Sequence, residues 1–139
     1  MNTFVGNLQL DFGDWGMAGR IAVLLSPVTW ICAVPGAALT VAIPAGEMSD
    51  GASVPQFLWW FMPPWGDRAT FAAILHDFLS LRLLNGRPIA GAETREKCDR
   101  QFYLALKALG LPEWRARLAW LGVRANSISF ELTGWPPQR

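Results

Sequence analysis

The chain of 139 residues has few charges, one histidine, two cysteines and no internal repeat. Charged residues make up 17% of it, against about 25% in typical soluble domains. The net charge of +1 gives no electrostatic reason for strong binding to nucleic acid, so we expect no nucleic-acid partner. One histidine and two cysteines without a Cys-x-x-Cys spacing exclude a zinc finger and a disulfide scaffold. The N-terminus has no signal-peptide pattern, and a reducing, cytosolic setting is therefore the default expectation.

Residues 21–46 contain no charged side chain, and such a run is superficially similar to a membrane span. Three prolines interrupt it, namely Pro27, Pro35 and Pro44, and Pro35 is followed by a glycine. A spanning helix needs about 20 continuous apolar residues, whereas proline and glycine punctuate short strands. We therefore expect strands here and no transmembrane segment.

The first part of the chain has the composition of a β-sheet. Apolar and β-branched residues recur over 4–12, 20–31 and 39–43, with glycines and a Pro-Gly pair between these runs. From residue 53 onward the pattern changes to helical spacing. Strands followed by helices are typical of an α+β fold, here a small N-terminal antiparallel sheet packed against three to four C-terminal helices.

Helix boundaries follow from caps and breakers in the second part. We predict a short helix over 56–62, a helix over 68–84, a third over 93–109 that ends at Gly110, and a last one that begins at Pro112. The chain is thus expected to form one domain, β-rich over 1–52 and helical over 53–125, with an irregular tail over 126–139.

The candidate site consists of one imidazole and three carboxylates that are far apart in the sequence. His76 and Asp77 interrupt an apolar helix, Asp50 follows the predicted strand 39–43, and Asp99 lies on the next helix. Buried ionisable groups are costly unless they are paired, so these side chains need partners or a purpose. If they converge, they could bind a divalent metal, with His76, Asp77 and Asp50 as catalytic groups and all four as candidate ligands.

The alternative is a structural polar network, and the sequence alone favours it. A lone histidine on an apolar helix is usually a hydrogen-bonded core residue, and no complete metal-binding motif is present. A nucleophilic triad built on Ser53 is disfavoured, because Ser53 is placed to cap a helix and lacks the glycine pattern of a nucleophile elbow.

The run over 57–65, Phe-Leu-Trp-Trp-Phe-Met-Pro-Pro-Trp, contains three tryptophans, Trp59, Trp60 and Trp65. A short helix with aromatic side chains on every side cannot bury all of them in a domain of this size. The run either packs into the core with one exposed edge or forms a docking surface for another protein. The second alternative arises because tryptophan and other aromatic side chains dominate interface energies. With Ser53, these tryptophans are the candidate binding residues.

Three ordered motifs resemble a known family. They are Ser-Asp-Gly-Ala-Ser-Val-Pro over 49–55, Leu-His-Asp-Phe-Leu over 75–79, and Cys-Asp-Arg-Gln-Phe over 98–102. Together they are similar to the bacteriophage and prophage family called domain of unknown function 1353, over roughly residues 38–125. The resemblance implies a phage or prophage origin, with Asp50, Ser53, Pro55, His76, Asp77 and Asp99 on the motif positions, and no established activity.

We therefore expect an accessory protein, associated with the virion or tail, that acts by binding other phage structural proteins or further copies of itself. It would be found in the host cytoplasm or the virion. The second hypothesis is a small metal-dependent hydrolase that uses Asp50, His76, Asp77 and Asp99. For this hypothesis the cofactor is a divalent metal, of a kind that the sequence does not identify.

Overall fold

The computed structural model describes residues 2–13, 21–49 and 69–133. The strands and helices in these ranges, in chain order, are β1 (Thr3–Gly6), β2 (Leu10–Gly13), β3 (Ile21–Leu24), β4 (Val28–Cys32), β5 (Leu39–Ile43), β6 (Met48–Ser49), α1 (Ala69–Leu84), α2 (Arg95–Ala108) and α3 (Glu113–Thr133). The predicted α+β class is confirmed: antiparallel strands come first and three helices follow in the described part of the chain.

The strands form two three-stranded sheets, with the orders β1-β4-β5 and β2-β3-β6. The predicted strand over 39–43 is β5, and its buried and exposed residues alternate as they should in a sheet with one covered face. The two longer predicted runs are each split into two strands, β1 with β2 and β3 with β4. Pro27 lies at the second break, where its fixed φ and missing N–H favour a turn over a continuous strand.

The helix boundaries agree closely with the caps in the sequence. Thr94 is the N-cap of α2, because its side-chain oxygen accepts a hydrogen bond from the Lys97 backbone N–H at 3.1 Å. Gly110 follows the C-cap residue Leu109 with a φ of +97°, the left-handed conformation that glycine adopts without strain. The predicted helix over 56–62 lies outside the described residues.

Helix α3 runs to Thr133, so the irregular tail predicted from residue 126 is wrong for 126–133. No proline or glycine interrupts the chain between Gly122 and Gly134, and the helix therefore has no local stop signal there. Buried Val123 and Ser127, four residues apart, continue its inner face past the predicted end.

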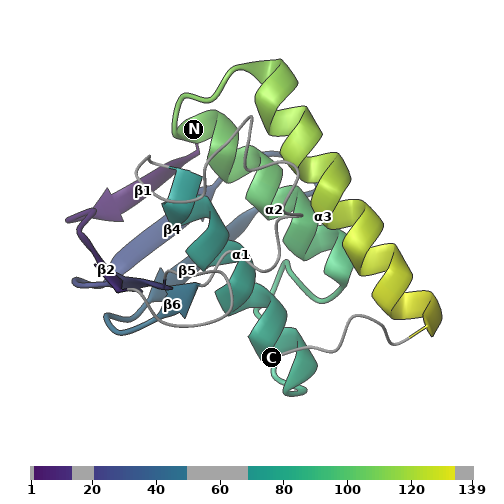
Figure 1. Ribbon diagram of the computed structural model, residues 1–139, viewed down its shortest axis with the longest axis horizontal. Coiled ribbons are helices and arrows are strands. Elements are labelled where there is room, and N and C mark those ends of the chain that lie inside the picture. Colours follow the sequence, from purple (N-terminus) through teal and green to yellow (C-terminus); the bar gives the residue numbers. More distant parts are fainter. Residues whose placement is uncertain (1, 14–20, 50–68, 134–139) are drawn as a thin grey trace.

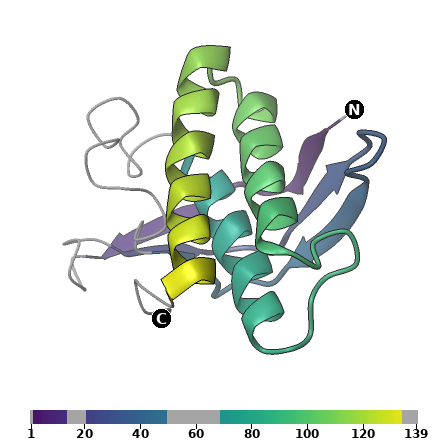
Figure 2. The same ribbon diagram turned by 90° about the vertical axis from the view of Figure 1, so that its right-hand side faces the viewer.

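The helices stack outward from the strands. Figure 1 shows α1 against the sheets, α2 beside α1, and α3 as the outermost helix, and Figure 2 shows α2 and α3 side by side. Every residue from Thr70 to Ser80 on α1 is buried, so this helix has no exposed face around His76. The core combines its side chains with the inner faces of β4 and β5. In the described ranges, no helix has both the length and the apolar character that crossing a membrane requires.

Gly91 fixes the chain just before α2. Its φ is +95°, and an added Cβ would lie 2.8 Å from the Ala38 carbonyl oxygen, closer than side chains tolerate. The loop between α1 and α2 can therefore approach the turn between β4 and β5 only with glycine at this position. This close approach sets the starting point of the helix that carries Asp99.

Candidate functional site

The centre of the candidate site is a hydrogen bond between α1 and α2. The Nε2 atom of His76 lies 2.6 Å from Oδ1 of Asp99, and the two residues are 2% and 0% exposed. Because an ionised carboxylate can only accept, the imidazole donates through Nε2. A charge-assisted hydrogen bond of this length away from water is among the stronger polar contacts that a protein makes.

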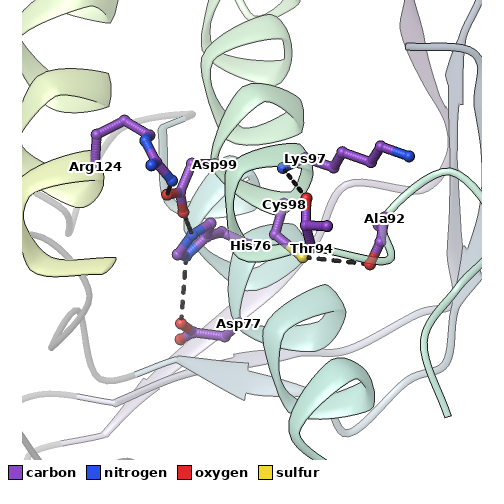
Figure 3. A network of polar contacts seen from close by, with 8 residues as sticks. All are labelled: His76, Asp77, Ala92, Thr94, Lys97, Cys98, Asp99 and Arg124. Atoms are coloured by element: carbon purple, nitrogen blue, oxygen red, sulfur yellow. Dashed lines mark hydrogen bonds and ion pairs between the residues drawn. The ribbon is translucent and has the colours of Figure 1, made fainter. Parts of the chain in front are cut away.

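The second oxygen of Asp99 is also engaged. Nη1 of Arg124 on α3 donates to Oδ2 of Asp99 at 2.8 Å. One carboxylate from α2 thus connects an imidazole from α1 with a guanidinium from α3, as Figure 3 shows. We call His76, Asp99 and Arg124 the Asp99 cluster.

The other ring nitrogen of His76 faces Asp77. Nδ1 of His76 and Oδ1 of Asp77 are 4.0 Å apart, which is beyond hydrogen-bond distance (Figure 3). Within the ranges that the structure describes, Nδ1 is buried and has no hydrogen-bond partner. Nδ1 is thus the ring nitrogen that makes no hydrogen bond to a described residue, and in a neutral imidazole that donates through Nε2 it carries the lone pair.

The structure brings three of the four predicted site residues together. His76, Asp77 and Asp99 lie at one place beneath the helices, and their proposed roles stay predictions. Asp99 is fully buried between helices. Its hydrogen bond with His76 joins α2 to α1.

The remaining predicted site residues lie outside the described part of the chain. These are Asp50, Ser53, Trp59, Trp60 and Trp65. Among the described residues, no group of three or more His, Cys, Asp or Glu side chains is arranged to hold a metal ion. The four-ligand metal site is accordingly neither assembled nor tested by the described residues, and it would need Asp50 or another group from the undescribed segments.

Sequence reasoning missed Arg124. It lies 25 residues after Asp99 on a different helix. The signal available in the sequence was that Arg124 follows the mainly apolar run over 116–123. In the structure its side chain is only 14% exposed. An isolated guanidinium at the edge of an apolar run indicates a buried anionic partner.

Gln101 was also missed, and it joins α2 to the sheet. The indole Nε1 of Trp30 donates to Oε1 of Gln101 at 2.9 Å, and Nε2 of Gln101 donates to the Ala37 carbonyl at 2.8 Å. Trp30 and Gln101 are 0% and 1% exposed. Asp99 and Gln101, two residues apart, thus fasten α2 to the other helices and to the strands, respectively.

The thiol beside Asp99 is not a nucleophile. Burial raises the pKa of Cys98 to about 12, and the negative charge of Asp99 raises it further. The Cys98 thiol lies 3.7 Å from the Ala92 carbonyl, to which it donates (Figure 3). Such a thiol stays protonated at neutral pH, so thiolate chemistry does not belong to this site.

The fold and the Asp99 cluster define an α+β protein in which one buried carboxylate joins three helices. The chain belongs to the family described as "Protein of unknown function (DUF1353)", whose model matches residues 28–123. It is 28% identical over 91 residues to "Uncharacterized protein y4jT" of Sinorhizobium fredii (strain NBRC 101917 / NGR234). That match covers 65% of this chain and 25% of the relative, so the chain spans about a quarter of the relative's length. No solved structure matches the chain.

Proposed function

We propose that this protein is a phage- or prophage-encoded accessory protein that acts by binding another protein, as a component of the virion or tail or of its assembly in the host cytoplasm. The Asp99 cluster supports a structural role for the polar site. Both oxygens of Asp99 are used by side chains from other helices, and the carboxylate is fully buried. An acid in this setting holds a fold together and has no free atom for a substrate.

A row of exposed apolar side chains on α3 carries the binding proposal. Trp114, Leu121 and Ile128 recur every seven residues, and they are 54%, 51% and 44% exposed. A seven-residue interval places them on one face of the helix, away from the buried side that includes Val123 and Ser127. Large apolar side chains aligned on an exposed helix are typical of a surface that a protein partner covers. We call Trp114, Leu121 and Ile128 the α3 stripe.

The test uses an epitope-tagged chain expressed in the host strain that carries the gene, followed by purification of the particles formed after induction. We expect the wild-type chain to copurify with particles and the double variant Trp114→Ser, Leu121→Ser to be lost from them. The matched control is Leu25→Ser, which replaces an equally exposed apolar side chain, 53% accessible, outside α3. Absence of the wild-type chain from particles, or retention of the double variant at the wild-type level, would refute the proposal.

The tryptophans of the run over 57–65 extend the same proposal. Trp59→Ser with Trp60→Ser should reduce association with a virion partner, or self-association, more than it unfolds the monomer. Unfolding of this variant, followed by circular dichroism, would show instead that the two side chains belong to the core.

A second candidate, a small metal-dependent hydrolase, is favoured by the environment of His76. Histidines that bind metals usually donate their other ring N–H to a carboxylate, as His76 does to Asp99. Nδ1 is then the atom that would face the metal, with Asp77 beside it at 4.0 Å. A bound divalent metal would supply an activated water, and the described residues provide only part of its ligand set.

Metal content separates the two candidates. The purified chain is analysed for bound metal, and its unfolding temperature is measured with added Mn²⁺, Zn²⁺ or Mg²⁺. Stoichiometric metal that is lost in a folded Asp50→Ala variant would favour the hydrolase. The binding proposal predicts no stoichiometric metal and no increase in unfolding temperature that depends on Asp50 or His76.

A further inference from the structure

A hollow lies between α2 and α3, on the outer side of the Asp99 cluster. Its volume is about 520 Å³, within the range of about 300–1,000 Å³ that is usual for small-molecule sites. Its lining side chains are Glu96, Arg100, Tyr103, Arg117, Trp120 and Arg124. We call it the α2–α3 groove. The lining combines three guanidinium groups and two aromatic rings with a single carboxylate.

Two of the three guanidinium groups in this groove are paired with carboxylates. Arg117 pairs with Glu113 at 3.0 Å, and Arg124 pairs with Asp99 at 2.8 Å. Arg100 is exposed, and within the described ranges it has no ion-pair partner. The groove therefore presents one guanidinium that is in no ion pair with a described residue, on the same lining as the Glu96 carboxylate and next to two guanidiniums that are already oriented.

The paired arginines keep donors for a ligand. A guanidinium has five N–H donors in a rigid plane, and the contact with Asp99 occupies one nitrogen of Arg124, Nη1. Because Asp99 fixes that side chain, an anion that binds it has less side-chain freedom to restrict. Planar guanidiniums bind phosphate or carboxylate oxygens in pairs, which favours such anions over halides.

The aromatic rings add a second kind of contact. The centroids of Tyr103 and Trp120 are 6.4 Å apart and the rings are inclined at 64°, so they meet edge to face. Both side chains are partly exposed at the groove. The Tyr103 hydroxyl donates to Oε2 of Glu113 at 2.7 Å, which holds its ring in place. A planar ring of a ligand could stack on Trp120 while its anionic group contacts the arginines.

We infer that the α2–α3 groove binds a small phosphate ester that carries a planar ring, of the chemical class of a nucleoside monophosphate. The inference rests only on α2 and α3 side chains. It holds or fails independently of particle association, because its test uses the purified chain alone. Because Arg124 lines the groove and also donates to Asp99, a ligand that binds Arg124 should change the surroundings of His76.

The experiment is titration calorimetry of the full chain with adenosine 5′-monophosphate, and separately with inorganic phosphate and with adenosine. We expect saturable binding of the nucleotide, weaker binding of phosphate, and weaker still or no binding of adenosine. Arg100→Gln should weaken nucleotide binding about tenfold or more, the loss of one hydrogen bond to a charged group. Trp120→Leu should weaken nucleotide binding and leave phosphate binding unchanged.

The matched control is Arg87→Gln, which removes the same charge from an exposed position outside the groove. Its affinity for the nucleotide should equal that of the wild type. Absence of saturable nucleotide binding overturns the inference, and so does an equal loss of affinity in Arg87→Gln and Arg100→Gln. Phosphate that binds as tightly as the nucleotide would overturn the role of the ring.

A second readout uses the chain's only histidine. The imidazole ¹⁵N signals of His76 can be assigned without ambiguity, because His76 is the only histidine in the sequence. A ligand that shares Arg124 with Asp99 should shift these signals in proportion to occupancy, with the same dissociation constant as calorimetry. Saturable binding without any shift of the His76 signals would place the ligand elsewhere and contradict the assignment to the groove.

Discussion

Two polar clusters connect α2 to α3, and they differ in their exposure to water. The Asp99 cluster is buried, and its carboxylate has two partners. The second cluster is centred on Glu113, whose carboxylate contacts Tyr103, Lys107 and Arg117 while its side chain remains 45% exposed. We call these four residues the Glu113 cluster. It has more partners, yet solvent screens each of its contacts, so the smaller buried cluster should contribute more to stability.

The largest effect is expected from the buried carboxylate. Asp99→Ala removes the partner of both His76 and Arg124, and breaking a buried charged pair typically costs about 3–5 kcal/mol of unfolding free energy. Urea unfolding followed by circular dichroism measures the loss. The control Glu96→Ala, at an exposed position on the same helix, should change the unfolding free energy by less than about 0.5 kcal/mol. Equal losses in the two variants would remove the distinction between buried and exposed groups.

A smaller loss is expected from the neutral buried contact on the same helix. Gln101→Leu fills a similar volume but leaves the Trp30 indole N–H and the Ala37 carbonyl without their partner. An unsatisfied buried polar group costs about 1–3 kcal/mol, so this variant should fall between Asp99→Ala and the exposed control. The same urea titration checks this order. A Gln101→Leu protein as stable as the wild type would mean that water or a side-chain shift satisfies Trp30.

The smallest effect is expected from the Glu113 cluster, and it should depend on pH. The hydrogen bond from Lys107, followed by those with Tyr103 and Arg117, lowers the pKa of Glu113 from 4.5 to about 2. A lowered carboxyl pKa stabilises the fold fully above the unfolded value of 4.5, and this contribution disappears as the pH falls towards 2.

Glu113→Gln should therefore unfold at a slightly lower temperature than the wild type at neutral pH, with the difference narrowing below pH 4.5 and vanishing near pH 2. Thermal unfolding at a series of pH values measures this. A difference that stays constant across the series would show that Glu113 acts through packing and not through its charge.

Much of the fold could be predicted from local signals. The strand over 39–43, the stop at Gly110 and the position of α2 follow from alternation, capping and glycine conformation, which depend on neighbouring residues. The breaks in the two long predicted strands and the length of α3 were harder to predict from the sequence. Their ends depend on sheet pairing and on packing of residues such as Ser127, and these are long-range properties.

Part of the candidate site could also be predicted from the sequence. His76 and Asp99 stand out because ionisable residues in apolar helices need partners, and their pairing follows from burial. Arg124 was harder to assign, because many arginines lie on these helices and the only sequence signal is the apolar run before it; the antiparallel packing of α2 and α3 selects it. The burial of the side chains around His76 on α1 could not be predicted from the sequence either. Small residues near a histidine are compatible both with an exposed helix face and with close helix packing.

The most direct test of the Asp99 cluster is a double-mutant cycle between His76 and Asp99, measured as unfolding free energies of His76→Ala, Asp99→Ala and the double variant. Contacting residues of one buried network have coupling energies of about 0.5–3 kcal/mol, so the double variant should be less destabilised than the sum of the two single variants. Strictly additive losses would contradict a shared hydrogen bond and, with it, the proposal that one carboxylate holds the three helices together.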